Sequence, residues 1–577
     1  MAKKIFDYIV IGTGTAGGIV AKELTDDNRT SVLMLEAGTN MTNELSSPSL
    51  ETATILATDN KFSFNILSSF QPSIGRLLRL SLGRAIGGSS EHNAMYAVRG
   101  SKELYDEWAG LVGDQWSYNQ LSPLFVQNET YTGVSQTPSE RGTKGPIFVR
   151  QQIVPNGGLT EILAQAASAA LGIPLVEDYN TGIRDCTFTK SQFIQQQVNG
   201  KLVRSSTATG YLNQTIVSQG NQTNPDEFGV GHRRLVIFAK TTVNKILLRK
   251  KHKDIVAVGV EYVRNGISQR AFARKGVIVS AGSFSSVILQ RSGIGSTADL
   301  AKAGISTVVE SPNVGHHFQA HQSIAMGVEV ETSRLLQVIA SDPNQPIPLG
   351  AFKKEDGPGR RLQLLAVPVP FILPAQEVAI NNWVFNPQKP SNVMSIAIVD
   401  LNPKSRGTIT VAHSDPEAYP SVNFNPFENP DDLTFMVSQY IETYKIMKKA
   451  RELDPEGLYK VVFPPEAIFE IPDEIEKRTA LSAYALASLS TFDHFGGQCK
   501  MARTIQEGVV DGFLNVFGVK NVKVADLSIA PILPDGNTSL PAQIIGLNAV
   551  RFLREEPTPC LLNDGDFDIE EDFDDDE

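Results

Sequence analysis

The feature that most constrains this chain is a glycine spacing near its N-terminus. The apolar run 8–11, of strand type, is followed at once by Gly12, Gly14 and Gly17 in the pattern G-x-G-x-x-G. Gly12 permits a tight turn, Gly14 lets the backbone approach a pyrophosphate, and Gly17 allows a helix to pack closely on the strand. The spacing therefore predicts a strand, a turn and a helix that together bind a dinucleotide.

The residues after these glycines complete the pattern. Helical residues run from about Thr15 to Asp26, and a second apolar run, 31–35, ends in Glu36. The helix N-terminus would face the phosphates with its free N–H groups. Glu36 stands where an acid accepts hydrogen bonds from ribose hydroxyls, and an acid there disfavours the 2′-phosphate of NADP. A glycine-rich turn without a ligand is the alternative, but the strand, helix and acid around it argue against that interpretation.

Composition limits the class of protein. The 577 residues, 41% of them hydrophobic, suffice for a large core and more than one domain. Three scattered cysteines argue against a disulfide framework. No run is long and apolar enough to span a membrane, and the first strand begins near Ile5, which leaves no room for a signal peptide. We therefore expect a soluble, intracellular protein.

Negative charge is concentrated at the C-terminus. The chain carries 63 acidic and 52 basic residues, and ten of the acidic residues lie between Asp564 and Glu577. Such a composition predicts that residues 563–577 form a disordered acidic tail. Because the rest of the chain is nearly neutral and the tail repels phosphate groups, nucleic-acid binding is not expected.

A second glycine-rich stretch, residues 76–100, reads RLLRLSLGRAIGGSSEHNAMYAVRG. Its small residues allow the backbone to come close to a planar ligand. Together with the N-terminal fingerprint, this stretch resembles the glucose-methanol-choline (GMC) oxidoreductases, flavoproteins in which a similar loop lies along the FAD isoalloxazine. The resemblance implies that the flavin is lined by Gly88, Ser90, Asn93, Ala94 and Met95.

Other segments resemble the same family and imply further FAD contacts. The run 276–282 and the following SFSSVILQRSGIG resemble a second family signature, which places Ala281 close to the pyrophosphate. Val243, in a strand-like region that begins at Leu235, would set its backbone against the adenine edge. The resemblance also implies cofactor contacts at Thr15, Ala16, Ala37, Asp526, Leu527 and Thr538.

His92 precedes Asn93 in the arrangement Glu91-His92-Asn93. In some members of the family, a histidine at this place is bonded covalently to the 8α carbon of the flavin. A packed histidine with no bond to the flavin is the alternative, and the sequence leaves both open.

The segment 492–501, FDHFGGQCKM, resembles the family pattern H-x-x-G-T-C-x-M, and 534–541 resembles G-N-T-x-x-P. By that resemblance His494 and Asn537 face the N5 side of the flavin. Oxidising an alcohol removes a hydroxyl proton and a carbon-bound hydride. Flavin N5 would take the hydride, His494 would act as the base, and Asn537 would orient the hydroxyl group. The expected reaction converts an alcohol, preferably primary, to an aldehyde, with oxygen or another acceptor reoxidising the flavin.

Two places depart from the family pattern. Residues 314–321 read VGHHFQAH where relatives usually read V-G-x-N-L-x-D-H. The histidines His316, His317 and His321 could suggest a metal site, but the family match places them on a structural segment, so no metal is expected. Asp493 and Gln498 also replace usual residues, and a carboxylate at Asp493 would disfavour anionic substrates.

The predicted fold is α/β with two domains. A discontinuous Rossmann-like FAD-binding domain with a parallel sheet would comprise residues 1–155, 200–321 and 490–560. A substrate-binding domain with a mostly antiparallel sheet covered by helices would comprise residues 156–199 and 322–489. Two other functions stay open: a hydroxynitrile-lyase-type enzyme that binds flavin without hydride transfer, and a non-catalytic scaffold. A lyase would carry a second histidine where this chain has Asn537.

Overall fold

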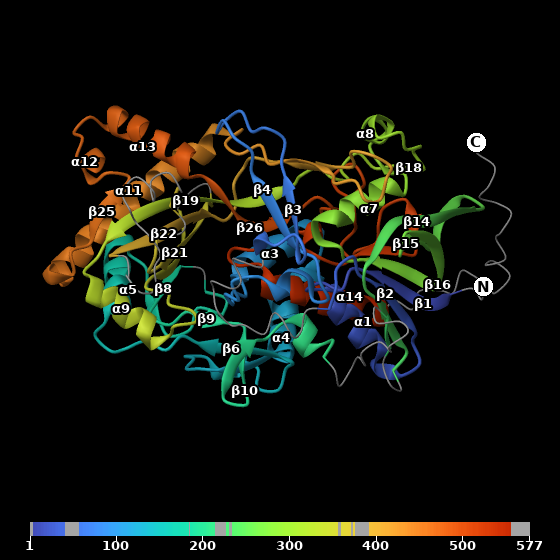
Figure 1. Ribbon diagram of the computed structural model, residues 1–577, viewed down its shortest axis with the longest axis horizontal. Helices are drawn as coiled ribbons and strands as arrows, with labels where there is room; N and C mark the ends of the chain where they lie inside the picture. The colour runs from blue at the N-terminus through green and yellow to red at the C-terminus, as the bar shows by residue number, and fades with distance from the viewer. Residues whose placement is uncertain are drawn as a thin grey trace.

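The structure is a computed structural model that describes residues 4–40, 57–183, 185–213, 227–229, 233–355, 359–370, 373–374 and 392–555. The segment predicted to be an acidic tail, residues 563–577, lies outside the described residues. Two large sheets lie toward opposite ends of the long axis of the molecule (Figure 1).

The first sheet is built around the apolar run that opens the chain. β1 (Ile5–Ile11) pairs in parallel with β2 (Val32–Leu35) on one side and with β16 (Ile267–Val279) on the other. The strand order is β12-β13-β2-β1-β16-β15-β14, with β27 beside β15 and β28 beside β16. The remaining strands are β12 (Glu227–Gly229), β13 (Leu235–Phe238), β14 (Thr241–Lys251), β15 (Asp254–Arg264), β27 (Val519–Lys520) and β28 (Val522–Val524).

The centre of this sheet is parallel, as predicted. β13, β2, β1, β16 and β28 run in the same direction, whereas β14, β15 and the first half of β16 form an antiparallel meander. Parallel strands are buried on both faces, which explains why β2 and the end of β16 are continuous apolar runs.

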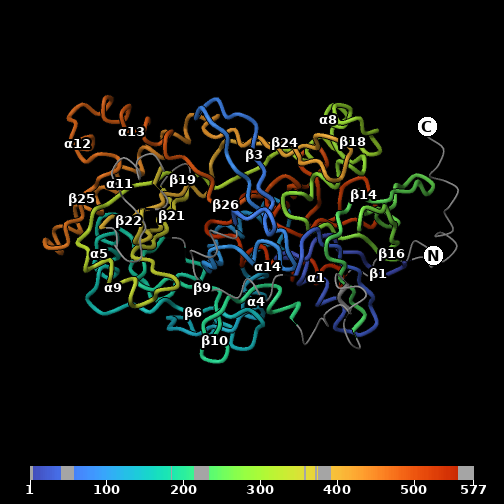
Figure 2. The backbone as a smooth tube through the Cα atoms, in the orientation of Figure 1, coloured from blue at the N-terminus to red at the C-terminus, as the bar shows by residue number. Residues whose placement is uncertain are grey.

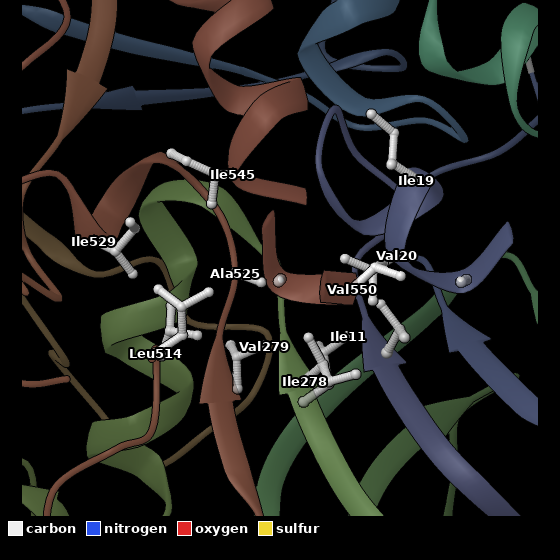
Figure 3. Close-up of a cluster of buried hydrophobic side chains, with 14 of the residues drawn as sticks. Ile11, Ile19, Val20, Ile278, Val279, Leu514, Ala525, Ile529, Ile545 and Val550 are labelled. Atoms are coloured by element: carbon white, nitrogen blue, oxygen red, sulfur yellow. The ribbon is translucent and has the colours of Figure 1, made fainter. Parts of the chain in front are cut away.

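Two helices from opposite ends of the chain pack together beside these strands. α1 (Gly17–Leu24) begins two residues later than the sequence indicates, because Thr15 and Ala16 belong to the turn. α14 (Ser539–Glu555) lies against α1, and a Cβ at Gly546 would stand 2.8 Å from the Ala16 carbonyl oxygen. Figure 3 shows the apolar side chains between the strands and the helices, among them Ile11, Ile19, Val20, Ile278, Ile545 and Val550.

The second sheet is almost entirely antiparallel, which agrees with the prediction. Its strand order is β25-β19-β22-β21-β20-β8-β7, and β26 also pairs with β19. Only β7 and β8 are parallel among the pairs of this sheet in the described residues. The strands are β7 (Leu175–Val176), β8 (Cys186–Phe188), β19 (Gln319–Glu329), β20 (Gly350–Lys354), β21 (Arg361–Val367), β22 (Val393–Asp400), β25 (Lys460–Phe463) and β26 (Ser490–Gly496).

Long helices cover the second sheet: α5 (Leu159–Leu171), α11 (Pro430–Leu453) and α13 (Glu474–Ser488). α11 begins where its sequence favours a helix start. The Asn429 side chain accepts a hydrogen bond from the Asp431 N–H (3.0 Å), Pro430 occupies the first turn, and two acidic residues follow. Its buried face, which includes Tyr440 and Met447, packs with the apolar side chains of β19, β21 and β22.

Shorter elements connect the two sheets. They include β3 (Ser63–Leu67), β4 (Arg79–Gly83), α3 (Lys102–Val112), α4 (Tyr118–Asn128), β6 (Ile147–Gln151), β9 (Gln192–Phe193) and α7 (Ser285–Arg291). β26 lies in the middle of the molecule (Figure 2), and it contacts β4. Residues 490–496, which the sequence places with the first domain, therefore form a strand of the second sheet. The division into two domains stays a prediction.

Within the described ranges, no helix has the length and apolar character needed to cross a membrane.

The turn after β1 generates a stability prediction. A Cβ at Gly17 would lie 2.3 Å from the Gly12 carbonyl oxygen, closer than real contacts allow, so Gly17→Ala must displace α1 from the strand. We expect this substitution to lower the free energy of unfolding by about 1–3 kcal/mol, measured by chemical denaturation.

Gly110→Ala in α3 is the matched control, because a Cβ there meets nothing within 4 Å. Removing a helical glycine should leave stability unchanged or raise it by up to about 1 kcal/mol. Equal losses of stability in both variants would contradict the packing role of Gly17.

Candidate active site

One cavity of about 1060 Å³ is lined by residues of both sheets and of the loops between them. Most residues that the sequence singles out line it: Gly12, Gly14, Thr15, Ala16, Glu36, Ala37, Gly88, His92, Asn93, Ala94, Met95, Val243, Ala281, Asp526, Leu527, Thr538, His494 and Asn537. Gly17 and Ser90 are not among its lining residues. Segments hundreds of residues apart in sequence thus share one cavity.

Glycine backbones shape one end of the cavity. Gly12 has φ of +92°, and a Cβ there would lie 2.5 Å from the Ser280 carbonyl oxygen. Gly88 has φ of +55°, and a Cβ there would lie 2.7 Å from the Gly14 Cα. Only glycine suits such backbone conformations and contacts at no steric cost. The two glycine-rich loops therefore meet backbone to backbone at the cavity wall.

Glu36, directly after β2, links the turn after β1 to the segment that follows β2. One carboxylate oxygen accepts hydrogen bonds from the Thr13 N–H (3.0 Å) and hydroxyl (2.7 Å), and the other accepts from the Gly38 N–H (2.8 Å). Burial raises the pKa of Glu36, while these hydrogen bonds oppose the rise. A carboxylate offers about four acceptor positions, so Glu36 keeps capacity for a ligand in the cavity it lines.

The loop 88–95 is held from behind by Arg204. The Arg204 guanidinium donates to the Asn93 side-chain oxygen (2.6 Å) and to the Ser90 carbonyl (3.1 Å). The Ser90 hydroxyl donates to the Gly87 carbonyl (2.7 Å) and accepts from the Thr207 N–H (3.2 Å). These bonds turn Ser90 into the protein, which explains why it does not line the cavity as the resemblance implies.

His92 lines the cavity and is 7% exposed. Its Nε2 is buried and has no hydrogen-bond partner in the described part of the chain. Burial, assisted by the positive charge of Arg204, lowers the pKa of His92 to about 4. The ring is therefore neutral at physiological pH, and a neutral imidazole nitrogen is a nucleophile.

Asp526 organises the strand ends opposite the first glycine turn. One oxygen accepts hydrogen bonds from the Gly282 N–H (2.9 Å) and the Ser285 hydroxyl (2.5 Å), and the other accepts from the Ser528 N–H (2.8 Å). Burial raises the pKa of the Asp526 carboxyl. This carboxylate thereby joins the end of β16 to the segment after β28, where Ala281 and Leu527 face the cavity.

The predicted catalytic pair is brought together. His494, on β26, places its Nε2 3.2 Å from the Asn537 side-chain nitrogen. The Gln363 side chain, from β21, donates to the Asn537 side-chain oxygen at 2.9 Å. Because that oxygen is occupied, the Asn537 amide nitrogen faces His494 and donates to its Nε2. Burial lowers the pKa of His494 to about 3, so the ring is neutral.

A second histidine, which sequence reasoning assigned no functional role, contacts His494. The Nδ1 atoms of His321 and His494 are 3.0 Å apart, and the two rings meet edge to face. His321 is fully buried in β19, and burial holds its pKa well below the ordinary value. The Leu401 and Pro534 carbonyls lie beside its ring, although Nε2 makes no close hydrogen bond to the described residues.

The three histidines of residues 314–321 go to three different places. His316 pairs with Asp299 (2.9 Å), and His317 lies 3.3 Å from the Asn313 side-chain oxygen. Only His321 of these three reaches His494.

His321 and Gln363 are the residues that sequence reasoning missed. The first contact joins two strands of one sheet and the second joins β21 to the segment before α14, and each spans more than 170 residues of sequence. His321 did carry a signal, because it aligns with the final histidine of the family pattern V-G-x-N-L-x-D-H.

Two models of the GMC oxidoreductase family match the chain, the N-terminal one over residues 6–323 and the C-terminal one over residues 403–546. The chain belongs to the GMC oxidoreductases, as the sequence motifs indicate, and is an FAD-dependent oxidoreductase acting on CH–OH donors.

Named relatives cover nearly the whole chain. It is 27% identical to 5-(hydroxymethyl)furfural oxidase of Methylovorus sp., over 94% of this chain and 98% of that one. It is 28% identical to oxygen-dependent choline dehydrogenase of Acinetobacter baumannii, over 92% and 94% of the two chains. A solved structure concerned with FAD modification in Aspergillus oryzae formate oxidase matches with a TM-score of 0.79 at 22% identity, over 96% and 99%.

The residues of the cavity fit FAD. Two glycine backbones leave room beside the turn after β1, Glu36 offers acceptor positions, and the buried Nε2 of His92 has no partner in the described structure. These features lie along one cavity that continues to His494 and Asn537.

The contacts of Glu36 predict how FAD retention depends on it. Glu36→Gln replaces one acceptor oxygen with an amide N–H₂ group. This donor would then face the N–H group of Thr13 or of Gly38, which is also a donor, and the turn would be disturbed. We expect the Kd for FAD to rise about tenfold or more, measured in a His92→Ala background, where no covalent bond to the flavin can form, by titrating the protein stripped of flavin.

Glu23→Gln on α1 is the control, because the Glu23 carboxylate pairs with Lys22 away from the cavity lining. An unchanged Kd in Glu36→Gln, or an equal change in both variants, would contradict the role of Glu36.

Proposed function

We propose that this GMC oxidoreductase converts a primary alcohol to an aldehyde, with His494 as the base that takes the hydroxyl proton. The observation that carries the proposal is the 3.2 Å contact between His494 Nε2 and the Asn537 amide nitrogen, in the wall of the cavity that also holds the glycine loops. FAD, when bound, accepts the hydride from the carbinol carbon and passes the electrons to oxygen or another acceptor.

The hydrogen-bond chain supports an assignment of protons. The Asn537 amide donates to His494 Nε2, so this nitrogen carries a lone pair. A neutral imidazole holds one proton, which must then sit on Nδ1 and be donated to Nδ1 of His321. His321 would accordingly carry its own proton on Nε2, beside the Leu401 and Pro534 carbonyls.

This arrangement suits alcohol activation. The alcohol oxygen would replace the direct contact between the two groups, accepting a hydrogen bond from the Asn537 amide and donating its proton to His494 Nε2. The resulting imidazolium would keep its Nδ1–H on His321, whose lone pair stabilises the new positive charge. Gln363 would hold the Asn537 amide in the orientation that the hydroxyl group requires.

The base assignment predicts a rate effect. His494→Ala removes the acceptor for the hydroxyl proton, so we expect the rate of flavin reduction by a neutral alcohol to fall about 100-fold or more, measured anaerobically by stopped flow.

Because burial holds the pKa of His494 at about 3, the wild-type rate should stay flat from about pH 8 to about pH 5.

His321→Gln separates positioning from packing. The glutamine can still accept a hydrogen bond from His494 Nδ1, whereas His321→Leu cannot. We expect the glutamine variant to retain most of the rate and the leucine variant to lose about tenfold or more.

A rate that survives His494→Ala, or one that falls through an acid limb near pH 6.5, would contradict the base assignment.

We also propose that His92 Nε2 would bond covalently to the 8α carbon of FAD. One 8α C–H bond would break, its electron pair would reduce the flavin by two electrons, the 8α and imidazole protons would be released, and oxygen or another acceptor would reoxidise the flavin. His92 lines the cavity, and its neutral, buried Nε2 has no partner in the described structure, which supports bond formation there rather than packing alone. After acid denaturation, the flavin absorbance should remain with the wild-type chain and be released from His92→Ala. Complete release of FAD from the wild-type protein would refute the covalent bond.

A further inference from the structure

An acidic side chain stands next to the base. β26 departs from regular pairing with β19: Ala320 pairs with Phe495 and Gln322 with Thr491, so residues 492–494 oppose His321 alone. Asp493, within this bulge, has a left-handed backbone with φ of +51°. In a regular strand, neighbouring side chains point to opposite faces, but here Asp493 and His494 both line the cavity.

The Asp493 carboxylate is available to a ligand. Asp493 is exposed and lines the cavity. Among the described residues, none forms a hydrogen bond with its carboxylate or an ion pair with it within 4 Å. Because protein surrounds the cavity, burial still raises the pKa of Asp493 to about 6, while the positive charge of Arg79 opposes this rise.

The other acidic side chains that line the cavity in the described residues are placed differently. Glu36 and Asp526 each accept three or more hydrogen bonds near the glycine turn. Glu417 lies in the loop near Arg291 and Tyr419, on the lining segment that includes Pro416 and Ala418. Asp493 alone of these four is adjacent to the base.

Two arginines line the same part of the cavity. The Arg76 guanidinium donates to the Leu486 carbonyl (3.1 Å) and to the Leu489 carbonyl at the end of α13, so its charge is directed at backbone acceptors. Arg79, on β4, forms no ion pair with Asp493 within 4 Å. Apolar residues of the cavity wall include Ile347, Leu365, Val367 and Phe492.

We propose that Asp493 is a specificity-determining residue that makes this site prefer alcohols carrying a cationic amine a short distance from the hydroxyl carbon. The inference rests on the proposed alcohol oxidation. Asp493 and His494 are consecutive, with Cα atoms about 3.8 Å apart, so a short aliphatic spacer can join the amine at Asp493 to the hydroxyl group at His494. The unpaired carboxylate attracts an ammonium group and repels a carboxylate.

A matched trio of substrates tests the preference: 3-amino-1-propanol, 1-butanol and 3-hydroxypropanoate. These have similar size and differ in charge. For the FAD-loaded enzyme at pH 8, we expect kcat/KM for the amino alcohol to exceed that for butanol by about tenfold or more, with the hydroxy acid poorest.

Below about pH 6 the amino-alcohol preference should fade, because protonating Asp493 removes its charge, while Arg76 and Arg79 stay positive and His494 stays neutral.

Asp493→Asn should abolish the preference, so that the ratio of amino-alcohol to butanol kcat/KM falls about tenfold or more. Asparagine keeps the side-chain size and tolerates the left-handed backbone, and Asp493→Gly provides a second variant for the same conformation. Arg79→Gln on the facing strand is the matched control. Its ratio of amino-alcohol to butanol kcat/KM should stay unchanged or rise. FAD content measured for each variant shows that the fold is intact.

Equilibrium binding of propylamine, which carries the charge but no hydroxyl group, supplies a readout independent of turnover. Its Kd should rise about tenfold from wild type to Asp493→Asn. Equal Kd values, or a wild-type preference for butanol or hydroxypropanoate, would overturn the inference and leave alcohol oxidation standing. If no alcohol in the trio is oxidised, the failure belongs to the proposed function, and propylamine binding still decides the role of Asp493.

Discussion

The architecture depends on backbone contacts that only glycine permits. At the turn after β1, Gly12 lies against Ser280, Gly17 lies against the Gly12 carbonyl, and Gly88 lies against Gly14. These contacts bring the first strand, the end of β16 and the loop 88–95 within van der Waals distance. One wall of the cavity is therefore made largely of backbone, which allows close approach of a flat or phosphorylated ligand.

The other end of the cavity is organised by a chain of side-chain hydrogen bonds. It runs from His321 through His494 and Asn537 to Gln363, and its members come from β19, β26, the segment before α14, and β21. Three members of this chain lie on strands of the second sheet. The fourth, Asn537, directly precedes α14, which packs on the first sheet, so the site joins the two halves of the fold. The bulge in β26 places the base and Asp493 on the same cavity.

The fold and the cofactor loops could be predicted from the sequence because glycine spacing encodes local backbone conformation directly. Gly12 and Gly17 have the turn and packing roles that their spacing indicates. The pair of His494 and Asn537 was found through flanking motifs. The contact of His321 with His494 could not be predicted in this way, because it depends on strand register between segments 173 residues apart. The inward orientation of the Ser90 side chain depends on its hydrogen bond with Thr207, 117 residues away, so no local sequence pattern could indicate it.

Alcohol oxidation is tested directly by the visible spectrum of the FAD-loaded protein without oxygen, before and after a panel of primary alcohols is added. We expect at least one class of alcohol to bleach the oxidised flavin band and to yield aldehyde in an amount equimolar with the flavin. A flavin band that every alcohol leaves unchanged would contradict alcohol oxidation, and would favour a lyase or a non-catalytic role for the same fold.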